Sequence, residues 1–230
     1  MRRTLALSLA LSLSLGLLSG CGPAAPAVQA QELTAQPVSV QPAGSPAVDQ
    51  ALTSFGLSLL QSAREAESGP VLLSPLSAAL ALSMAANGAD GDTLAQFETV
   101  LGGGVTLDEL NAACTQLLSD YGDLGGSTEC LIANSLWTDP EGMIREDFIG
   151  KCQGIFDAQV FSQDLSAPSV VPAVNSWVSE HTNKMIPSIL SEPFNENAAL
   201  LLVNALYLKN TWETEFDPNN TYLRGFYHQG

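Results

Sequence analysis

The amino-acid sequence predicts an α+β fold in which helices pack around a sheet. Several segments place apolar residues at helical spacing, and short runs rich in apolar and β-branched residues stand between them. No internal repeat is visible along the 230 residues. The part after position 48, roughly 180 residues, is long enough for one domain with a sizeable core.

The first twenty residues predict an export signal and not a part of this fold. Arg2 and Arg3 precede an apolar and serine-rich run that ends at Leu18, which is typical of secretory signals. A permanent membrane span needs about 20 apolar residues, so this run is too short, and no second run of that length follows. We expect residues 1–20 to be a removed leader and the protein to be exported.

The leader ends in Leu18-Ser19-Gly20-Cys21, which resembles a bacterial lipobox. In that motif the peptide is cut before the cysteine, whose thiol is diacylated, and two acyl chains suffice for stable anchoring. The alternative is an ordinary secretory signal with an incidental cysteine. Cys21 is therefore the predicted lipidation site and contact with the membrane. The expected location is the outward face of the cell membrane, or the extracellular space.

Residues 21–48 predict a lipidated cysteine followed by a tether rich in proline and alanine. Positions 22–48 contain five prolines, no aromatic residue and one charged residue. Such a segment buries too little apolar surface to offset the entropy of ordering, and proline-rich tethers are semi-extended. The folded domain is expected over residues 49–230.

The mature chain is strongly acidic. Removal of the leader takes away two of the eight basic residues, which leaves six against 24 acidic ones, a net charge of about −18. A surface of this charge repels nucleic acid and anionic membranes. We expect no nucleic-acid partner, and a covalent anchor to the membrane.

The first half of the domain predicts helices around one short strand. Ser74 is a favourable N-cap and Pro75 fits a first helical turn, so a helix begins there. The expected elements are a helix over residues 49–64, a buried strand over 71–73, the helix from Pro75, and short helices over 93–101 and 107–118.

The second half predicts a stronger alternation of strands and helices. The continuous apolar run AALLLVNALYL at 198–208 indicates a strand that is covered on both faces. The expected elements are strands over 130–137, 158–161 and 198–208, and helices over 145–153 and about 170–184.

Polar residues inside apolar runs are the clearest candidates for a functional site. Asn204 interrupts the apolar run at 198–208, and a buried amide group without a partner costs about 1–3 kcal/mol. Ser74 and Ser77, at the start of an apolar helix, are features of the same kind. We expect a local polar network around these residues; the alternative is that Ser74 is only a cap and Asn204 marks a strand end.

Catalytic, metal and cofactor signals are weak. The only histidines are His181 and His228, and no serine stands in a G-x-S-x-G elbow. No catalytic residue, metal or cofactor is expected. Cys114, Cys130 and Cys152 are an odd number without C-x-x-C spacing, so neither a full disulfide framework nor a zinc site follows. We expect buried thiols, with one disulfide among them as the alternative.

Several sequence blocks resemble the serpin family of protease inhibitors. Residues 71–101 are similar to the serpin segment in which a strand leads through S-P-x-S into the central helix, followed by G-A-x-G-x-T. Lys184 stands where the family usually has glycine, so this sequence departs from the family pattern at the turn from helix to loop. Further blocks occur in serpin order: 132–136, 175–178 with Thr182 and Asn183, and 202–209 with Thr211, Trp212 and Phe216.

The resemblance implies a serpin-like α+β fold, with helices around a large mixed or antiparallel central sheet that is incomplete at the C-terminus. It also implies inhibition of serine proteases, or of cysteine proteases, by a suicide-substrate mechanism. A reactive loop is cleaved and then inserts into the main sheet, which distorts the acylated protease and releases stored strain. The reactive-site bond would lie after position 230, so this chain is expected to be an inactive fragment. The alternative is a non-inhibitory serpin-like lipoprotein with a binding or structural role at the surface.

The resemblance further assigns roles to particular residues. Ser74, Ser77 and Asn204 would belong to the polar shutter under the sheet, and Trp212 to the breach, at the upper end of the insertion gap. The strand at 198–208 would lie beside the inserting loop. Without its neighbours that strand is a long apolar edge, which templates aggregation, so we expect residues 22–230 alone to aggregate or to form a molten state.

Overall fold

The computed structural model of this chain describes residues 30–122 and 124–225. The leader, the predicted lipidation site Cys21, the start of the predicted tether and His228 lie outside these residues. The elements in chain order are β1 (Gln31–Leu33), α1 (Pro46–Ala66), α2 (Pro75–Ala86), α3 (Gly91–Gly102), α4 (Leu107–Gly122), β2 (Glu129–Thr138), α5 (Glu146–Phe156), β3 (Ala158–Ser162), α6 (Val170–His181), β4 (Leu200–Lys209) and a short 3-10 helix (Pro218–Asn220).

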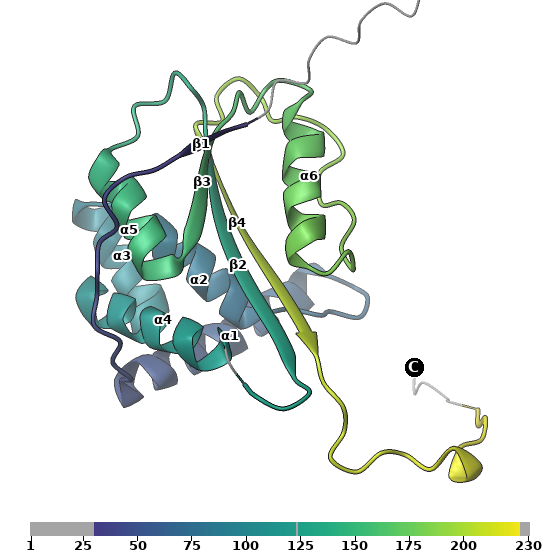
Figure 1. The fold of residues 1–230 in the computed structure, drawn as a ribbon. Helices are drawn as coiled ribbons and strands as arrows, with labels where there is room; N and C mark the ends of the chain where they lie inside the picture. The colour runs from purple at the N-terminus through teal and green to yellow at the C-terminus, as the bar shows by residue number, and fades with distance from the viewer. Residues whose placement is uncertain (1–29, 123, 226–230) are drawn as a thin grey trace, which may run out of the picture.

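A mixed sheet in the order β1-β3-β2-β4 lies at the centre of the fold. β2 pairs with β3 in parallel, whereas the β1–β3 and β2–β4 pairs are antiparallel. Helix α6 covers one face of this sheet, and α1 to α5 lie on the other side (Figure 1). The predicted α+β class, with helices packed around a mixed sheet, is confirmed.

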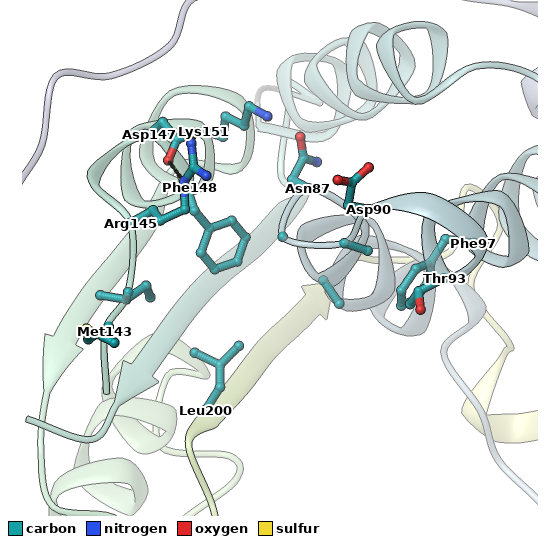
Figure 2. Close-up of a pocket in the computed structure, with 14 residues that line it drawn as sticks. Asn87, Asp90, Thr93, Phe97, Met143, Arg145, Asp147, Phe148, Lys151 and Leu200 are labelled. Carbon is teal, nitrogen blue, oxygen red and sulfur yellow. Dashed lines mark hydrogen bonds and ion pairs between the residues drawn. The ribbon is translucent and has the colours of Figure 1, made fainter. Parts of the chain in front are cut away.

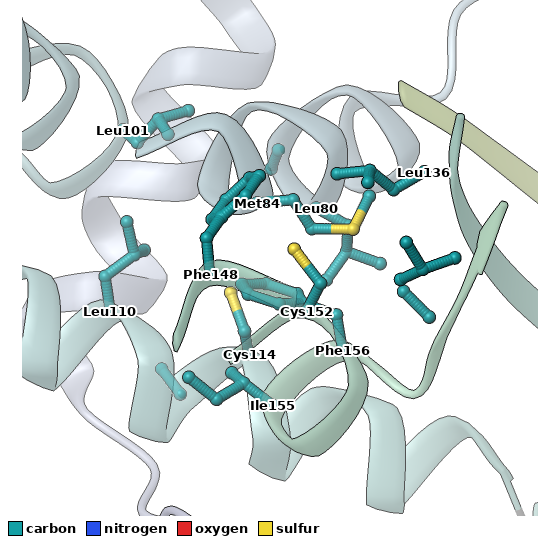
Figure 3. Packing of buried hydrophobic residues seen from close by; sticks show 14 of the residues in the cluster. Leu80, Met84, Leu101, Leu110, Cys114, Leu136, Phe148, Cys152, Ile155 and Phe156 are labelled. Carbon is teal, nitrogen blue, oxygen red and sulfur yellow. The ribbon is translucent and has the colours of Figure 1, made fainter. Parts of the chain in front are cut away.

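Two apolar cores fill the space on the two sides of the sheet. The first core joins α1–α5 to the sheet, and its fully buried members include Leu80, Met84 and Phe156 (Figure 3). The second core lies between the sheet and α6. Truncation of such a buried side chain to alanine costs about 2–5 kcal/mol, so both layers depend on their packing.

Strand β4 contributes to both cores because neighbouring residues in a strand point to opposite faces. Leu202 packs against the first core, and Val203 belongs to the second. The prediction that this strand is covered on both faces is confirmed for its middle. Its ends are more open, since Leu200 and Leu208 are 41% and 60% exposed, and β4 is the last strand of the sheet.

The predicted tether is wrong for residues 30–45, which lie on the body of the protein. β1 pairs with the edge of β3, the Val38 N–H donates to the Gly150 carbonyl (2.9 Å), and the Ala43 N–H donates to the Ala112 carbonyl (3.2 Å). Composition predicted disorder for this segment, but backbone hydrogen bonds to an existing surface do not require apolar side chains. The first helix then begins at Pro46 with Ser45 as its N-cap, and not at Asp49.

The predicted buried strand at 71–73 is also wrong. These residues form no strand, and Leu72 is 97% exposed. A strand needs a neighbouring backbone to satisfy its hydrogen-bonding groups, and no strand of the described residues pairs with this segment.

Candidate functional site

A pair of asparagines joins the two long strands at the middle of the sheet. Asn134 of β2 lies directly opposite Asn204 of β4, and the Asn204 Nδ2 donates to the Asn134 Oδ1 at 2.8 Å. The Asn134 Nδ2 in turn donates to the carbonyl of Phe156, the last residue of α5, at 2.8 Å. Asn134, which is 2% exposed, therefore ties β4 and the end of α5 to the same strand.

One polar atom of this pair has no partner. The Oδ1 atom of Asn204 is buried and accepts no hydrogen bond from the described residues. Leaving such an acceptor unsatisfied costs about 1–3 kcal/mol. The sheet thus has an unused acceptor on its last strand.

The other two predicted site residues form a separate pair. The Ser74 side chain caps α2 and accepts from the Ser77 N–H at 3.3 Å, and the two hydroxyl oxygens are 2.9 Å apart. Within the described residues no hydrogen bond joins these serines to Asn204. The predicted N-cap is confirmed. The polar residues form two separate pairs and not one network: the serine pair is on α2, and the asparagine pair is on β2 and β4, where α2 contacts β4.

Asn134 was missed by the sequence analysis, although the signal was the same as for Asn204. It interrupts the apolar run of β2, CLIANSLW, as Asn204 interrupts that of β4. An amide inside an apolar strand needs a partner, and two such strands in one sheet predict that the amides meet.

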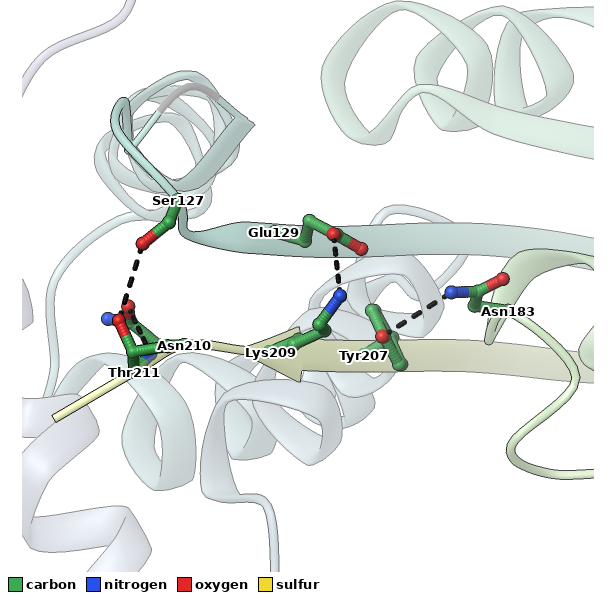
Figure 4. Close-up of polar contacts among 7 residues, drawn as sticks. All are labelled: Ser127, Glu129, Asn183, Tyr207, Lys209, Asn210 and Thr211. Carbon is green, nitrogen blue, oxygen red and sulfur yellow. Dashed lines mark hydrogen bonds and ion pairs between the residues drawn. The ribbon is translucent and has the colours of Figure 1, made fainter. Parts of the chain in front are cut away.

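Trp212 lies beyond the end of β4 and is 74% exposed. Its ring makes an edge contact with Phe216 at a centroid distance of 6.3 Å. Near it, two polar contacts join the ends of β2 and β4: the Lys209 Nζ and the Glu129 Oε1 are 3.1 Å apart, and the hydroxyls of Ser127 and Thr211 are 3.4 Å apart (Figure 4). Glu129 raises the pKa of Lys209 through this hydrogen bond.

The turn after α6 departs from ordinary backbone geometry. Asn183 and Lys184 have φ angles of 49° and 63°, in the left-handed region that favours glycine. The Asn183 Nδ2 donates to the hydroxyl of Tyr207 on β4 at 3.4 Å (Figure 4), which links the end of α6 to the last strand. The lysine at position 184 therefore occupies a place where a glycine would be free of strain.

The cysteines agree in part with the predicted buried thiols. Cys114 and Cys152 are buried in the first core (Figure 3), and burial raises the pKa of their thiols to about 11 and about 12. Cys130, on β2, is partly buried, and burial raises its pKa as well. All three are free, so the alternative of a disulfide among them does not apply to this structure.

A cavity of about 580 Å³ lies between the end of α2, the start of α3 and α5 (Figure 2). Several of its polar side chains already have partners. Arg145 forms a two-point ion pair with Asp147 at 2.9 and 3.0 Å, which lowers the pKa of that carboxyl group. Asn87 exchanges hydrogen bonds with Asn111 at 2.8 and 3.0 Å. The cavity lies at a junction of helices, and these four side chains are used in contacts within the fold.

His181 has a structural position on α6. Its ring stacks on Trp177 at 4.3 Å, and its Nδ1 lies 2.7 Å from the Trp177 carbonyl oxygen. Across residues 30–122 and 124–225, no group of three or more His, Cys, Asp or Glu side chains could hold a metal ion. In the same residues no helix has the length and apolar character needed to cross a membrane.

Comparisons with known proteins identify the class of this fold. A family model described as serpin (serine protease inhibitor) matches residues 50–230. Iripin-8 of Ixodes ricinus is 33% identical over 183 residues, which are 76% of this chain and 45% of the relative. Neuroserpin of Gallus gallus is 35% identical over 169 residues, which are 70% of this chain and 40% of the relative.

A solved structure gives the same result. The thermophilic serpin tengpin in its native state matches with a TM-score of 0.71 and 30% identity, covering 84% of this chain and 50% of that chain. The described body thus matches the serpin family in sequence and in fold. The chain belongs to the serpin family. It spans about half the length, or less, of the curated relatives that it matches.

Proposed function

We propose that this chain supplies the first half of the body of a lipid-anchored inhibitor of serine proteases that acts by loop insertion. The observation that carries the proposal is the state of β4. Among the described residues it pairs with β2 alone, and its central residue, Asn204, holds a buried acceptor that none of them uses. A strand with one open side and an unused acceptor is suited to receive a further segment.

In this proposal the reactive loop belongs to sequence after position 230. The serine Oγ of the protease bonds to the carbonyl carbon of the scissile peptide, and the peptide nitrogen leaves as an amine. The freed loop then inserts beside β4, and insertion supplies the energy that traps the acyl-enzyme. Ser74 and Ser77 at the start of α2, together with Asn134 and Asn204, form the polar shutter beneath that gap, and Trp212 marks its upper end. These residues are conformational and not catalytic.

The anchor in this proposal is the diacylated Cys21. The described body has no helix able to span a membrane, and the acidic surface repels anionic lipids. A pair of acyl chains supplies attachment that neither feature provides.

The test of inhibition uses the full-length protein. It is mixed with trypsin-like, chymotrypsin-like and elastase-like serine proteases and analysed by denaturing electrophoresis. We expect a denaturant-stable covalent complex with at least one of them, and none with a protease whose catalytic serine is replaced by alanine. Cleavage of the protein without a stable complex would reject loop-insertion inhibition and favour a non-inhibitory surface lipoprotein.

The test of the anchor is separate. Cells expressing the full-length protein are labelled with a radioactive fatty acid, and we expect label in the wild type and none in Cys21→Ala. Label that persists in Cys21→Ala, or is absent from both, would show that Cys21 is not the anchor and would leave the inhibition test unaffected.

A further inference from the structure

Residues 30–45 form a segment, the strap, that runs across the surface of the body. β1 adds a short strand to β3, with Gln31 opposite Ser162 and Leu33 opposite Val160. Beyond β1 the strap runs over α5 and α4 to the start of α1 (Figure 1). It thus connects four separate parts of the chain.

A single side chain of α5 holds the strap next to β1. The Gln153 Nε2 donates to the Leu33 carbonyl at 3.0 Å, and its Oε1 accepts from the Ala35 N–H at 2.9 Å. One amide thereby satisfies a donor and an acceptor of the strap backbone, as a neighbouring strand would.

Two glycines of α5 let the strap backbone approach the helix. A methyl group on Gly150 would overlap the Gln36 carbonyl oxygen, and one on Gly154 would lie 2.6 Å from the Val38 nitrogen and overlap the Val38 carbonyl oxygen. Glycine in a helix interior costs about 1 kcal/mol relative to alanine. The surface of α5 is therefore shaped to seat this backbone at the expense of helix propensity.

Docking of the strap sets the length of chain left between the body and the anchor. Ala30, the first described residue, lies nine residues after Cys21, whereas Ser45, the N-cap of α1, lies 24 residues after it. At about 3.3–3.6 Å per residue, nine residues reach at most about 30 Å and 24 residues about 80 Å. The docked strap removes more than half of the available reach.

We propose that the strap holds the body close to a lipid surface, with the groove between α6 and the sheet facing the bilayer. Ala30, the described residue nearest to the anchor in the sequence, lines this groove together with Trp137, Phe161, Pro172 and Trp177. The anchor then fixes both the height and the orientation of the body. Strand β4 lies at the opposite edge of the sheet from β1. The inference rests on the lipid anchor of the proposed function and is independent of inhibition.

The experiment measures the height of the full-length lipidated protein on supported phosphatidylcholine bilayers by neutron reflectometry. The double variant Gly150→Ala/Gly154→Ala releases the strap while alanine favours α5. The control Gly122→Ala changes a glycine that has no neighbour within 4 Å of an added methyl group. An insertion of 15 Gly and Ser residues between Ala25 and Pro26 lengthens the tether directly.

We expect the wild type and Gly122→Ala to sit at the same height. The double variant and the insertion should both increase the gap between bilayer and body, by on the order of 10 Å from random-coil scaling. Gln153→Ala, which removes two hydrogen bonds without adding an atom, should do so partly and serves where the double variant fails to fold.

The proposal is overturned by an unchanged height in both strap variants when the insertion raises the body, because the strap then does not set the reach. A protein that washes off the bilayer overturns it in a different way, since the anchor itself is then absent.

Discussion

The two edges of the sheet differ in how completely their polar groups are satisfied. At the β1 edge, the strap, Gln153 and a glycine-lined helix supply partners for the backbone. At the β4 edge, the strand has a neighbour on one side, and the buried Oδ1 atom of Asn204 has no partner in the described residues. The strap covers the outer side of β3, whereas no described strand pairs with the outer side of β4.

This difference identifies β4 as the edge of the sheet at which a further strand can pair. A closed edge resists pairing with another strand, whereas a long apolar open edge invites it. The same open edge that suits an inserting loop is a risk for association with a second copy of the chain. The strap edge offers less backbone for pairing, because β1 has three residues and Gln153 already binds the Leu33 carbonyl and the Ala35 N–H.

The largest expected effect is on self-association through the β4 edge. Residues 22–230 without further sequence should form soluble oligomers or aggregates, measured by light scattering. Leu208→Lys places a charge on β4 and should reduce the scattering several-fold, because charged side chains protect edge strands. Leu223→Lys is the matched control, since Leu223 is also exposed but lies outside the strand. Equal effects of both substitutions would assign association to general apolar exposure.

The asparagine pair should respond asymmetrically to truncation. Asn134→Ala leaves the Asn204 amide and the Phe156 carbonyl without partners and should cost about 3 kcal/mol of unfolding free energy. Asn204→Ala also removes an acceptor that is already unsatisfied, and should cost about 1 kcal/mol. Urea unfolding in the Leu208→Lys background measures both. Equal losses would mean that the Oδ1 atom of Asn204 is not an orphan.

The reactivity of the three cysteine thiols tests which side of the sheet is more accessible. At pH 8, Ellman's reagent should modify Cys130, opposite Leu208 on the open strand, before Cys114 and Cys152 in the first core. Mass spectrometry after partial modification identifies the order. Early modification of Cys152 would show that the α5 side, beneath the strap, opens first.

Alkaline pH should destabilise the protein through the buried thiols. The pKa of Cys114 is raised from 9.0 to about 11 in the folded state, so below pH 9 the thiol is neutral in both states. Between pH 9 and 11 the unfolded state releases a proton that the folded state keeps. Stability therefore falls, by about 1.4 kcal/mol per pH unit for this group. Cys114→Ala should flatten the slope of unfolding free energy against pH in that window.

The smallest expected effect is at the turn that links α6 to the open strand. Lys184→Gly relieves a left-handed backbone conformation and should stabilise the fold by about 0.5–1 kcal/mol. Lys184→Ala keeps the strain and should change stability little. A loss of stability in Lys184→Gly, measured by thermal unfolding, would show that the lysine side chain contributes more than its backbone costs.

Much of the fold was predictable because its signals are local. Helical spacing predicted α1, the Ser74 cap and Pro75 predicted α2, and the continuous apolar run at 198–208 predicted β4. The resemblance at residues 71–101 and 202–209 indicated the family, which the comparisons confirm. The Ser74 cap was predictable from sequence for the same reason, since its partner lies three residues away.

The parts that failed depend on distant neighbours. Residues 71–73 have strand composition but no partner strand in the described structure, and the strap has tether composition but lies on α5. Asn134 interrupts an apolar run as Asn204 does, but only the register of the strands places the two amides opposite each other. Composition cannot report which backbone a segment will meet, because backbone groups are the same in every residue.

The sequence by itself determined the family, the order of the helices and strands, and the polar residues inside apolar strands, since these depend on side-chain type and spacing. The tertiary structure alone decided which edge of the sheet is closed. That outcome depends on contacts between residues far apart in the sequence. At one edge the Gln153 side chain donates to the Leu33 carbonyl, 120 positions away, and at the other the buried amide oxygen of Asn204 has no partner in the described residues.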